Sequence, residues 1–476
     1  MALKIDRRLT AKALLPQLRR LFEISAAKIR SLERSWNPSR GTPVFTVKGK
    51  YTSRGWTEWT QGFQFGSALL QFDVTGETEF LELGRQRTLA RMATHVSHIG
   101  VHDHGFNNIS TYGNLWRLMR EGKIPFDNRE NAFYELALKV SGAVQAARWL
   151  GLPENEGYIY SFNGPHSLFV DTLRSLRSLA VAHQLGHVLM AERDRKVSLL
   201  HRLMTHARAT ASYNVYYGDG RDAYDVPGRT AHECIFNLND GSFRCPNSQQ
   251  GFSAFTTWTR GLAWAILGFA ELLEFYETPR ESRPSGGEPH RAGAISNHGA
   301  TEGMPFDSSF AATLLRAATA TADFYIANCC ADGIPMWDTG APNLHRLGDY
   351  LTKPAAPFNR WEPVDSWAAA IAAQGLMRLG NCLRAKRKQT DGTRYRQAGL
   401  TVAQTLLREP YLCVNTKHQG LLLHSVYHRP NGWDYIAPGQ KVPNGESCMW
   451  GDYHFRELAL LLWREAQGQS YPTFFA

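Results

Sequence analysis

The feature that most constrains the fold of this chain is the spacing of its apolar residues. In segment 14–32, leucine, isoleucine and phenylalanine recur at intervals of three, four and seven, which places them on one face of a helix. Similar stripes predict about a dozen helices, whereas strand-like alternation is scarce and is clearest in 43–52. The pattern favours an all-α fold. Because polar, aromatic and glycine-rich loops join the helices, we predict a toroid of inner and outer helices with functional loops at one end.

The chain length bears on the number of domains. Its 476 residues exceed the length of an ordinary domain, although some closed barrels reach this size as one unit. The most linker-like segment, 278–303, is rich in helix breakers and poor in apolar residues. Because helices of similar pattern flank it, we interpret it as a mobile insertion within a single domain that spans 1–476.

The net charge indicates which class of partner the protein binds, and the cysteine content indicates its redox compartment. A formal net charge of +10 favours an anionic partner. The basic residues are dispersed, and the one tight cluster, 384–388, is more typical of a solvated loop than of a nucleic-acid groove. Seven cysteines without zinc-knuckle spacing indicate reduced thiols, with Cys234 and Cys245 as the most tempting local pair. With no long apolar stretch and no secretory pattern, we expect a cytoplasmic monomer or homodimer that binds neither nucleic acid nor membrane.

The segment 95–108, HVSHIGVHDHGFNN, concentrates four histidines, an aspartate and two asparagines. A metal site needs three or four converging ligands, and neither a cysteine partner nor a His-Glu-x-x-His pattern supports one here. A polar or core role for the first two histidines, His95 and His98, is the more usual outcome. Gly105 would let the backbone turn tightly while Phe106 anchors the loop, which would hold the aspartate at a helix end facing a cavity.

Asp171 lies among apolar residues at the start of a predicted helix, in LFVDTLRSL. One interpretation is an N-cap, since aspartate accepts hydrogen bonds from the free amides of a first helical turn. The other is a carboxylate in low-dielectric surroundings, whose raised pKa would make it an acid near neutral pH. The residues alone leave both interpretations open.

A third region, 231–264, combines His232, Gln250, Trp258, Arg260 and Trp264. Amide, imidazole and guanidinium groups beside aromatic rings are typical of sugar-binding sites, and an arginine can bind a carboxylate through two parallel hydrogen bonds. The alternative is that the two tryptophans are core residues at helical spacing.

At these positions the chain resembles the unsaturated glucuronyl hydrolase family, which acts on 4,5-unsaturated uronic acids left at non-reducing ends by polysaccharide lyases. The resemblance extends from WTQGF at 59–63 to WGDY at 450–453 and so covers most of the chain. Between these ends, the matching positions are 102–106, Asp171, His232, Gln250 with the two residues after it, 256–264 and 363–366. The order and spacing of these motifs together make the resemblance specific.

The resemblance implies a six-hairpin (α/α)6 barrel without a metal or organic cofactor. It also implies hydration of the C4–C5 double bond of the sugar rather than displacement at the anomeric carbon. Asp171 would protonate C4 and help a water molecule add at C5, and the hemiketal formed would open and expel the neighbouring sugar. Asp103 would share or modulate the proton of Asp171, since two nearby carboxyl groups resist ionising together.

The remaining roles implied by the resemblance concern binding of an anionic unsaturated oligosaccharide. His232 and Gln250 would position substrate and water, and Arg260 with Asn444 and Ser447 would bind the carboxylate or the adjoining sugar. The expected substrate-binding set is completed by Trp59, Trp258 and Trp264.

The chain departs from the family pattern at two positions of interest. Gln64 replaces a frequent tryptophan, which predicts that one aromatic sugar platform is missing, and His104 replaces an aliphatic residue and could perturb the titration of Asp103. Three other functions are considered: an unsaturated rhamnogalacturonyl hydrolase with the same chemistry, a non-catalytic carbohydrate-binding barrel, and a conventional glycosidase whose carboxylates flank the glycosidic bond.

Overall fold

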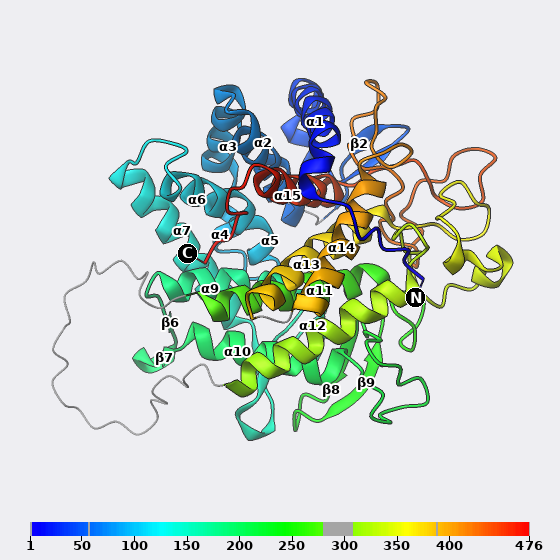
Figure 1. The fold of residues 1–476 in the computed structure, drawn as a ribbon. Coiled ribbons are helices and arrows are strands. Elements are labelled where there is room, and N and C mark those ends of the chain that lie inside the picture. The colour runs from blue at the N-terminus through cyan, green and yellow to red at the C-terminus, as the bar shows by residue number, and fades with distance from the viewer. Residues whose placement is uncertain (1, 56–57, 279–307, 387–388, 476) are drawn as a thin grey trace.

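The computed structural model describes residues 2–55, 58–278, 308–386 and 389–475. The predicted insertion at 278–303 lies, apart from Thr278, outside these residues. Most of the described chain is helical (Figure 1), so the all-α prediction is confirmed.

The helices form two concentric layers. Within the described ranges the inner layer contains α2 (Gln61–Thr75), α5 (His104–Asn108) continued through the π-helical turn η4 (Ile109–Gly113) into α6 (Asn114–Arg120), α8 (Thr172–Ser175) with α9 (Arg177–Gln184), α11 (Thr259–Glu277), α13 (Ser366–Ala385) and α15 (Met449–Ala466). Each inner segment contacts the next, and α15 contacts α2, so the contacts run in a ring.

The outer layer packs against this ring in the same order. Its helices are α1 (Leu15–Ser35), α3 (Thr78–Arg91), α7 (Asn128–Ala147), α10 (Leu199–Ala209), α12 (Ser308–Asn328) and α14 (Gln389–Leu406), and the short α4 (Ala93–Val96) follows α3. The predicted amphipathic stripe of 14–32 is the buried face of α1, whereas α13 is buried almost throughout its length. A helix that is apolar all round belongs inside, and one with a single apolar stripe belongs outside. The predicted toroid is therefore confirmed.

Strands are short and lie outside the helical ring. They are β1 (Phe45–Val47), β2 (Lys50–Thr52), β3 (Trp149–Gly151), β4 (Gly157–Ile159), β5 (Ser167–Phe169), β6 (Leu189–Met190), β7 (Lys196–Val197), β8 (Glu233–Phe236) and β9 (Phe243–Asn247). The alternation at 43–52 corresponds to the β1–β2 hairpin, whose two-residue turn has positive φ at Lys48 and Gly49, as turns of this kind require. The order β5–β8–β9 forms a three-stranded sheet that bears on the site.

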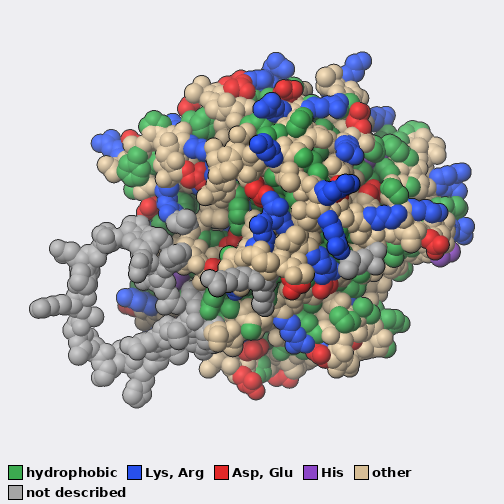
Figure 2. Space-filling model, viewed as in Figure 1, with side chains coloured by type: hydrophobic (Ala, Val, Ile, Leu, Met, Phe, Trp, Pro, Cys, Tyr) green, Lys and Arg blue, Asp and Glu red, His purple; other side chains and the backbone are tan. Residues whose placement is uncertain are grey.

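Three expectations drawn from composition remain: reduced cysteines, no membrane-spanning segment and dispersed basic residues. All seven cysteines are unpaired, as predicted, and Cys234 lies opposite Pro246 rather than Cys245 on the neighbouring strand. No helix in the described part of the chain is long and apolar enough to cross a membrane. Lys and Arg side chains are spread among acidic ones over the face shown in Figure 2. The described part of the 384–388 cluster ends α13, where Lys386 pairs with Glu277 at 2.7 Å.

Candidate functional site

A pocket of about 700 Å³ lies where the inner helices begin. Each inner segment of the described ring contributes a residue from its first turn or from just before it: Trp59, Asp103, Asp171, Trp258, Trp367 and Trp450. The pocket is therefore a product of the ring itself. Because helix N-termini carry partial positive charge, the starts of the long helices α11, α13 and α15 favour a negatively charged ligand.

Asp103 precedes α5 and lies at the pocket, as the sequence predicts. The predicted role of Gly105 is wrong, because this glycine lies inside α5 rather than in a tight turn. A Cβ at Gly105 would come within 2.1 Å of the Ser175 carbonyl oxygen, and the Gly105 N–H donates to Ser175 Oγ at 2.8 Å. Gly105 therefore lets α5 pack directly on α8, while Phe106 is buried against Trp264 with ring centroids 4.8 Å apart.

Asp171 immediately precedes α8 but makes no side-chain capping hydrogen bond. The N-cap interpretation thus does not account for this carboxylate. His102 is buried between the two aspartates, with its Nε2 3.9 Å from Asp103 Oδ1 and 3.9 Å from Asp171 Oδ2. Its ring stacks on Phe162 with an interplanar angle of 19°. Packing of α5 on α8 therefore brings both predicted catalytic carboxylates to one histidine nitrogen.

The charges of the two aspartates and the neighbouring histidines affect the pKa of each of these groups. Burial raises the pKa of Asp103, and the Asp171 carboxylate adds to that rise against the opposing effect of His102. Burial also acts to raise the pKa of Asp171, but His102 and His232 outweigh it and hold the pKa below its ordinary value. Burial opposes protonation of His102, yet the two carboxylates outweigh it and raise the pKa of His102. The raised pKa that one of the two interpretations gave Asp171 is not found in the free protein; the rise occurs at Asp103.

His232 reaches Asp171 through the small sheet. The Val170 N–H donates to the His232 carbonyl at 3.0 Å where β5 pairs with β8, which sets the next residue, Asp171, beside the imidazole. The backbone N–H groups of Gln249 and Gln250 donate to His232 Nδ1 at 3.1 and 3.3 Å. Burial lowers the pKa of His232 to about 4, so the neutral ring carries its proton on Nε2, 3.8 Å from Asp171 Oδ1.

Arg260, at the start of α11, is held by acceptors of the protein. Its Nη1 donates to the Val426 carbonyl at 2.7 Å, and its Nη2 donates to the Tyr427 carbonyl at 2.9 Å and to Gln250 Oε1 at 2.6 Å. Its guanidinium lies 4.1 Å from the ring centroids of both Trp258 and Trp367. Arg260 therefore fixes the amide of Gln250, whose N–H groups are left as the donors for a ligand.

The positive charge of Arg260 is only partly neutralised. Burial lowers its pKa to about 10, which keeps the guanidinium protonated at neutral pH. The nearest carboxylate is Asp365, whose Oδ2 lies 3.6 Å from Arg260 Nη1. Burial raises the pKa of Asp365 to about 7, so this carboxyl is only partly ionised at neutral pH. Arg260 thus contributes a positive charge at the pocket that attracts an anion.

Aromatic rings form much of the pocket wall. Trp59 stacks on Trp450 with centroids 5.3 Å apart, and Trp258 and Trp264 line the same cavity. The core interpretation of these last two tryptophans also has support, since they are 3% and 5% exposed. Buried rings with one face on a cavity serve as both core and wall.

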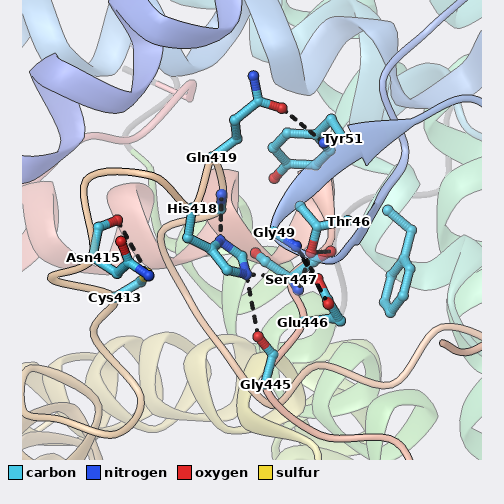
Figure 3. A network of polar contacts seen from close by, with 12 residues as sticks. Thr46, Gly49, Tyr51, Cys413, Asn415, His418, Gln419, Gly445, Glu446 and Ser447 are labelled. Carbon is cyan, nitrogen blue, oxygen red and sulfur yellow. Dashed lines mark hydrogen bonds and ion pairs between the residues drawn. The ribbon is translucent and has the colours of Figure 1, made fainter. Parts of the chain in front are cut away.

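Asn444 and Ser447 do not lie among the residues that line this pocket. The Ser447 side chain is fully buried and donates to Asp452 Oδ1 at 2.7 Å, while its backbone N–H donates to Thr46 Oγ1 at 2.8 Å (Figure 3). Ser447 therefore holds the C-terminal loops to the β1–β2 hairpin. The structure does not bring either residue together with the predicted set.

The two departures from the family pattern do not reach the pocket wall. Gln64 faces two other cavities, so it removes no platform from this pocket, contrary to the expectation. His104 is buried with Nδ1 3.0 Å from Ser141 Oγ and Nε2 2.9 Å from the His98 carbonyl, and burial lowers its pKa to about 4. A neutral His104 adds no charge beside Asp103.

The histidines of segment 95–108 take different roles. His95 has hydrogen-bond partners on both ring nitrogens, Gln61 at 3.2 Å and Asn107 at 3.1 Å, which is a structural polar role. Among the described residues, no three His, Cys, Asp or Glu side chains are grouped as a metal site requires. Of this segment, His102, Asp103 and Phe106 line the pocket.

Sequence reasoning assigned no role to several residues of the pocket wall, among them His102, Phe162, Gln249, Trp367, Tyr427, His428 and Trp433. His102 and Trp450 fall inside quoted motifs, and Trp367 directly follows another, so their positions gave a usable signal. His428 and Trp433 lie in a glycine- and asparagine-rich loop, where no periodicity indicates which side chains face inward.

Comparison with known proteins finds relatives that align with most of the chain. No family model matches. An unsaturated glucuronyl hydrolase from Bacillus sp. (strain GL1) is 25% identical over 441 residues, covering 89% of this chain and 90% of the relative. An unsaturated chondroitin disaccharide hydrolase from Streptococcus pyogenes serotype M1 is 23% identical over 433 residues, covering 89% and 86%.

Solved structures agree with these relatives in fold. An unsaturated glucuronyl hydrolase specific for heparin matches with a TM-score of 0.68 and 19% identity, covering 96% of this chain and 100% of that one. The enzyme from Bacillus sp. GL1 matches with a TM-score of 0.64 and 20% identity, covering 94% and 96%. The resemblance inferred from the motifs is confirmed, and the fold is that of these proteins.

Proposed function

We propose that this chain, a homologue of the unsaturated glucuronyl hydrolases over most of its length, removes 4,5-unsaturated glucuronic acid from the non-reducing end of lyase-generated oligosaccharides. The observation that carries the proposal is the placement of Asp103 and Asp171, each 3.9 Å from the same His102 nitrogen, in a pocket walled by tryptophans. The names of the relatives support the substrate class and the hydrolytic reaction.

The first step places a proton on Asp171. In the free pocket the proton favours Asp103 and His102, whose pKa values are raised, over Asp171, whose pKa is lowered. The carboxylate of a bound uronate repels a second negative charge and so raises the pKa of Asp171. The proton held beside His102 then passes to Asp171, and Asp171 delivers it to C4 of the double bond.

Protonation at C4 leaves positive charge shared between C5 and the ring oxygen. The ionised Asp171 accepts a proton from a water molecule as that water adds to C5, which restores the acid. The resulting hemiketal opens, the bond to the neighbouring sugar breaks, and the products are a 5-keto-4-deoxyuronate and the shortened oligosaccharide. One water molecule is consumed for each sugar released.

Two neighbours orient this chemistry. His232 presents its Nε2–H toward Asp171 from 3.8 Å, so it is placed to hold the water or a substrate hydroxyl beside the carboxylate. Gln250 offers amide N–H donors because its oxygen is held by Arg260. We assign substrate positioning to both residues.

The binding of an anionic sugar follows from charge and aromatic surface. Arg260 supplies a positive charge at the pocket, although its hydrogen bonds go mostly to the protein, so we assign it electrostatic attraction and support of Gln250. Trp59, Trp258 and Trp264 offer ring faces on which the apolar side of a sugar can stack.

The test is loss of the near-ultraviolet absorbance of the conjugated double bond, followed with purified protein and a panel of unsaturated disaccharides. The panel contains glycosaminoglycan-derived glucuronyl disaccharides and a pectin-derived rhamnogalacturonyl disaccharide, which separates the two unsaturated hydrolase functions. We expect decay on the glucuronyl substrates and a fall in rate of about 10²- to 10⁴-fold for Asp171→Asn.

The matched control is Asp332→Asn, a change of the same kind at a partly buried carboxyl outside the pocket that accepts hydrogen bonds from backbone amides. This variant should retain the wild-type rate. Release of an intact uronic acid instead of the keto acid would indicate a conventional glycosidase. Binding without decay on every substrate would favour a non-catalytic carbohydrate-binding barrel.

A further inference from the structure

Away from the pocket, a lysine of α1 is buried against a cysteine of the C-terminal region. Lys28 is 4% exposed and Cys413 is 2% exposed. Lys28 Nζ donates to Cys413 Sγ at 3.4 Å, and it donates to the carbonyls of Asn415 and His418 at 3.1 and 2.6 Å. Figure 3 shows Cys413, Asn415 and His418 close together on one loop.

This geometry fixes an amine against a thiol. The carbonyls of Asn415 and His418 hold the Lys28 ammonium in place, and its third N–H donates to the Cys413 sulfur. In the described part of the chain no other cysteine accepts a hydrogen bond from a lysine, and only Cys245 among the seven cysteines is not buried. The contact joins residues 385 positions apart in the sequence, so it depends on the complete fold.

We propose that Cys413 and Lys28 form an oxidant-driven covalent cross-link between the cysteine sulfur and the lysine nitrogen. The oxidant is hydrogen peroxide. The Cys413 thiolate takes one oxygen from peroxide to give a sulfenic acid, and the first water leaves with the thiol proton. The neutral Lys28 amine then attacks that sulfur: the S–N bond forms, the S–O bond breaks, and the hydroxyl leaves as a second water with an amine proton. The sulfur is oxidised by two electrons, peroxide is reduced to two waters, and the protein loses two hydrogen atoms.

The surroundings favour both halves of this reaction. Burial opposes ionisation of the Cys413 thiol, but His418 and Lys28 outweigh it and lower its pKa. Burial lowers the pKa of Lys28, which increases the fraction of neutral, nucleophilic amine. Lys28 also lines a separate cavity of about 430 Å³ bounded by α1, α2 and α15, so the lysine end of the contact borders a space that can admit a small oxidant. Attack by a thiolate and attack by a neutral amine are therefore both supported at this position.

The cross-link would join α1 to the loop region that continues to Tyr427, His428 and Trp433 of the pocket wall. A link between distant parts of the sequence restricts the unfolded chain and so stabilises the folded protein. Oxidation would thus fasten the C-terminal loops to the outer helical layer.

The experiment treats the reduced full-length protein with hydrogen peroxide and measures intact mass, followed by peptide mapping and thermal unfolding. We expect the loss of two hydrogens, a joined peptide containing Lys28 and Cys413, and a rise in Tm of roughly 2–5 °C. A thiol reductant should reverse all three changes. A joined peptide that keeps one oxygen between sulfur and nitrogen would overturn the direct S–N bond.

Three variants make the result decisive. Cys413→Ser and Lys28→Arg should both abolish the joined peptide, since the first lacks the sulfur and the second keeps the charge but lacks the primary amine. Cys245→Ser, at the half-buried thiol, should form the cross-link as the wild type does. Should Lys28→Arg fail to fold, the wild-type peptide map decides alone. Addition of oxygen at Cys413 with Lys28 unmodified, or no reaction at Cys413, would overturn the proposal.

Discussion

Replacing His102 with glutamine should move the alkaline limb of the pH–activity profile to higher pH. In the proposed reaction, the carboxyl pair must hold one proton that is delivered to C4, and the rate falls when that proton is lost. His102 lies 3.9 Å from each carboxylate and has a raised pKa, so it is a positive neighbour that favours loss of the proton. Its removal raises the pKa of the pair, and the active form persists to higher pH.

The distance sets the size of the effect. Two unit charges 3.9 Å apart interact by about 4 kcal/mol at an effective dielectric constant of ~20. This energy corresponds to about three pH units, which is the upper bound on the displacement of the alkaline limb. The two carboxyls titrate as a coupled pair, so the shift belongs to the pair and not to either residue alone.

The measurement is kcat/KM against pH, read from the decay of the unsaturated uronate absorbance. His104→Gln is the matched control, because His104 lies two residues away and burial lowers its pKa to about 4, so its loss removes no charge. Its alkaline limb should coincide with that of the wild type. If the alkaline limb of His102→Gln coincided with that of the wild type or moved to lower pH, the electrostatic role assigned to His102 would be refuted.

Three further predictions test other parts of the site. Asp103→Asn keeps the shape of a protonated carboxyl but cannot exchange a proton, so kcat should fall by about 10²-fold or more with KM nearly unchanged in steady-state kinetics. Arg260→Lys keeps the charge but carries its donors on one nitrogen, so it does not span Gln250 and the two carbonyls as Nη1 and Nη2 do; KM should rise by roughly tenfold while the kcat of saturated enzyme changes less. The folded pKa of Asp365, about 7, lies above the ordinary value of 3.8, so its contribution to stability is present at low pH and is lost as the pH rises from about 4 to about 7. Asp365→Asn should therefore show a smaller decline in the free energy of urea unfolding across this range.

The helical part of the fold could be predicted because its signal is local. The stripe of 14–32 contains the information that makes α1 amphipathic, and α13 shows its interior position by its alanine-rich, apolar composition. The grouping into six hairpins required the resemblance, since periodicity does not say which helices are neighbours. The β8–β9 pair was not predicted, because β9 (FRCPN) is short, largely exposed and lacks alternation. Such strands are stabilised by their partner rather than by their own pattern.

The two carboxylates proposed as catalytic could be located from their motifs, but their protonation could not be predicted. The proton favours Asp103 over Asp171 because His102 lies 3.9 Å from each carboxylate, whereas His232 lies 3.8 Å from Asp171 and further lowers its pKa. Those distances depend on the packing of α5 on α8 at Gly105 and on the pairing of β5 with β8. The prediction that Gln64 takes the place of a sugar platform failed for a similar reason, since the rotation of α2 about its axis decides which cavity that side chain meets.

The arrangement also indicates where substrate preference can change without loss of the fold. The inner helices bring their first residues to one pocket, and those residues are fixed by helix packing on every side. The departures from the family pattern at Gln64 and His104 lie behind this wall and do not touch the cavity. By contrast, the loop that supplies His428 and Trp433 is organised by hydrogen bonds within itself, from the His428 N–H to Asp434 Oδ2 and from the Asn431 N–H to His428 Nδ1. We therefore expect such loops to contact the sugar next to the unsaturated uronate and to set the preference for it, while the residues at the helix starts carry out the proposed proton transfer.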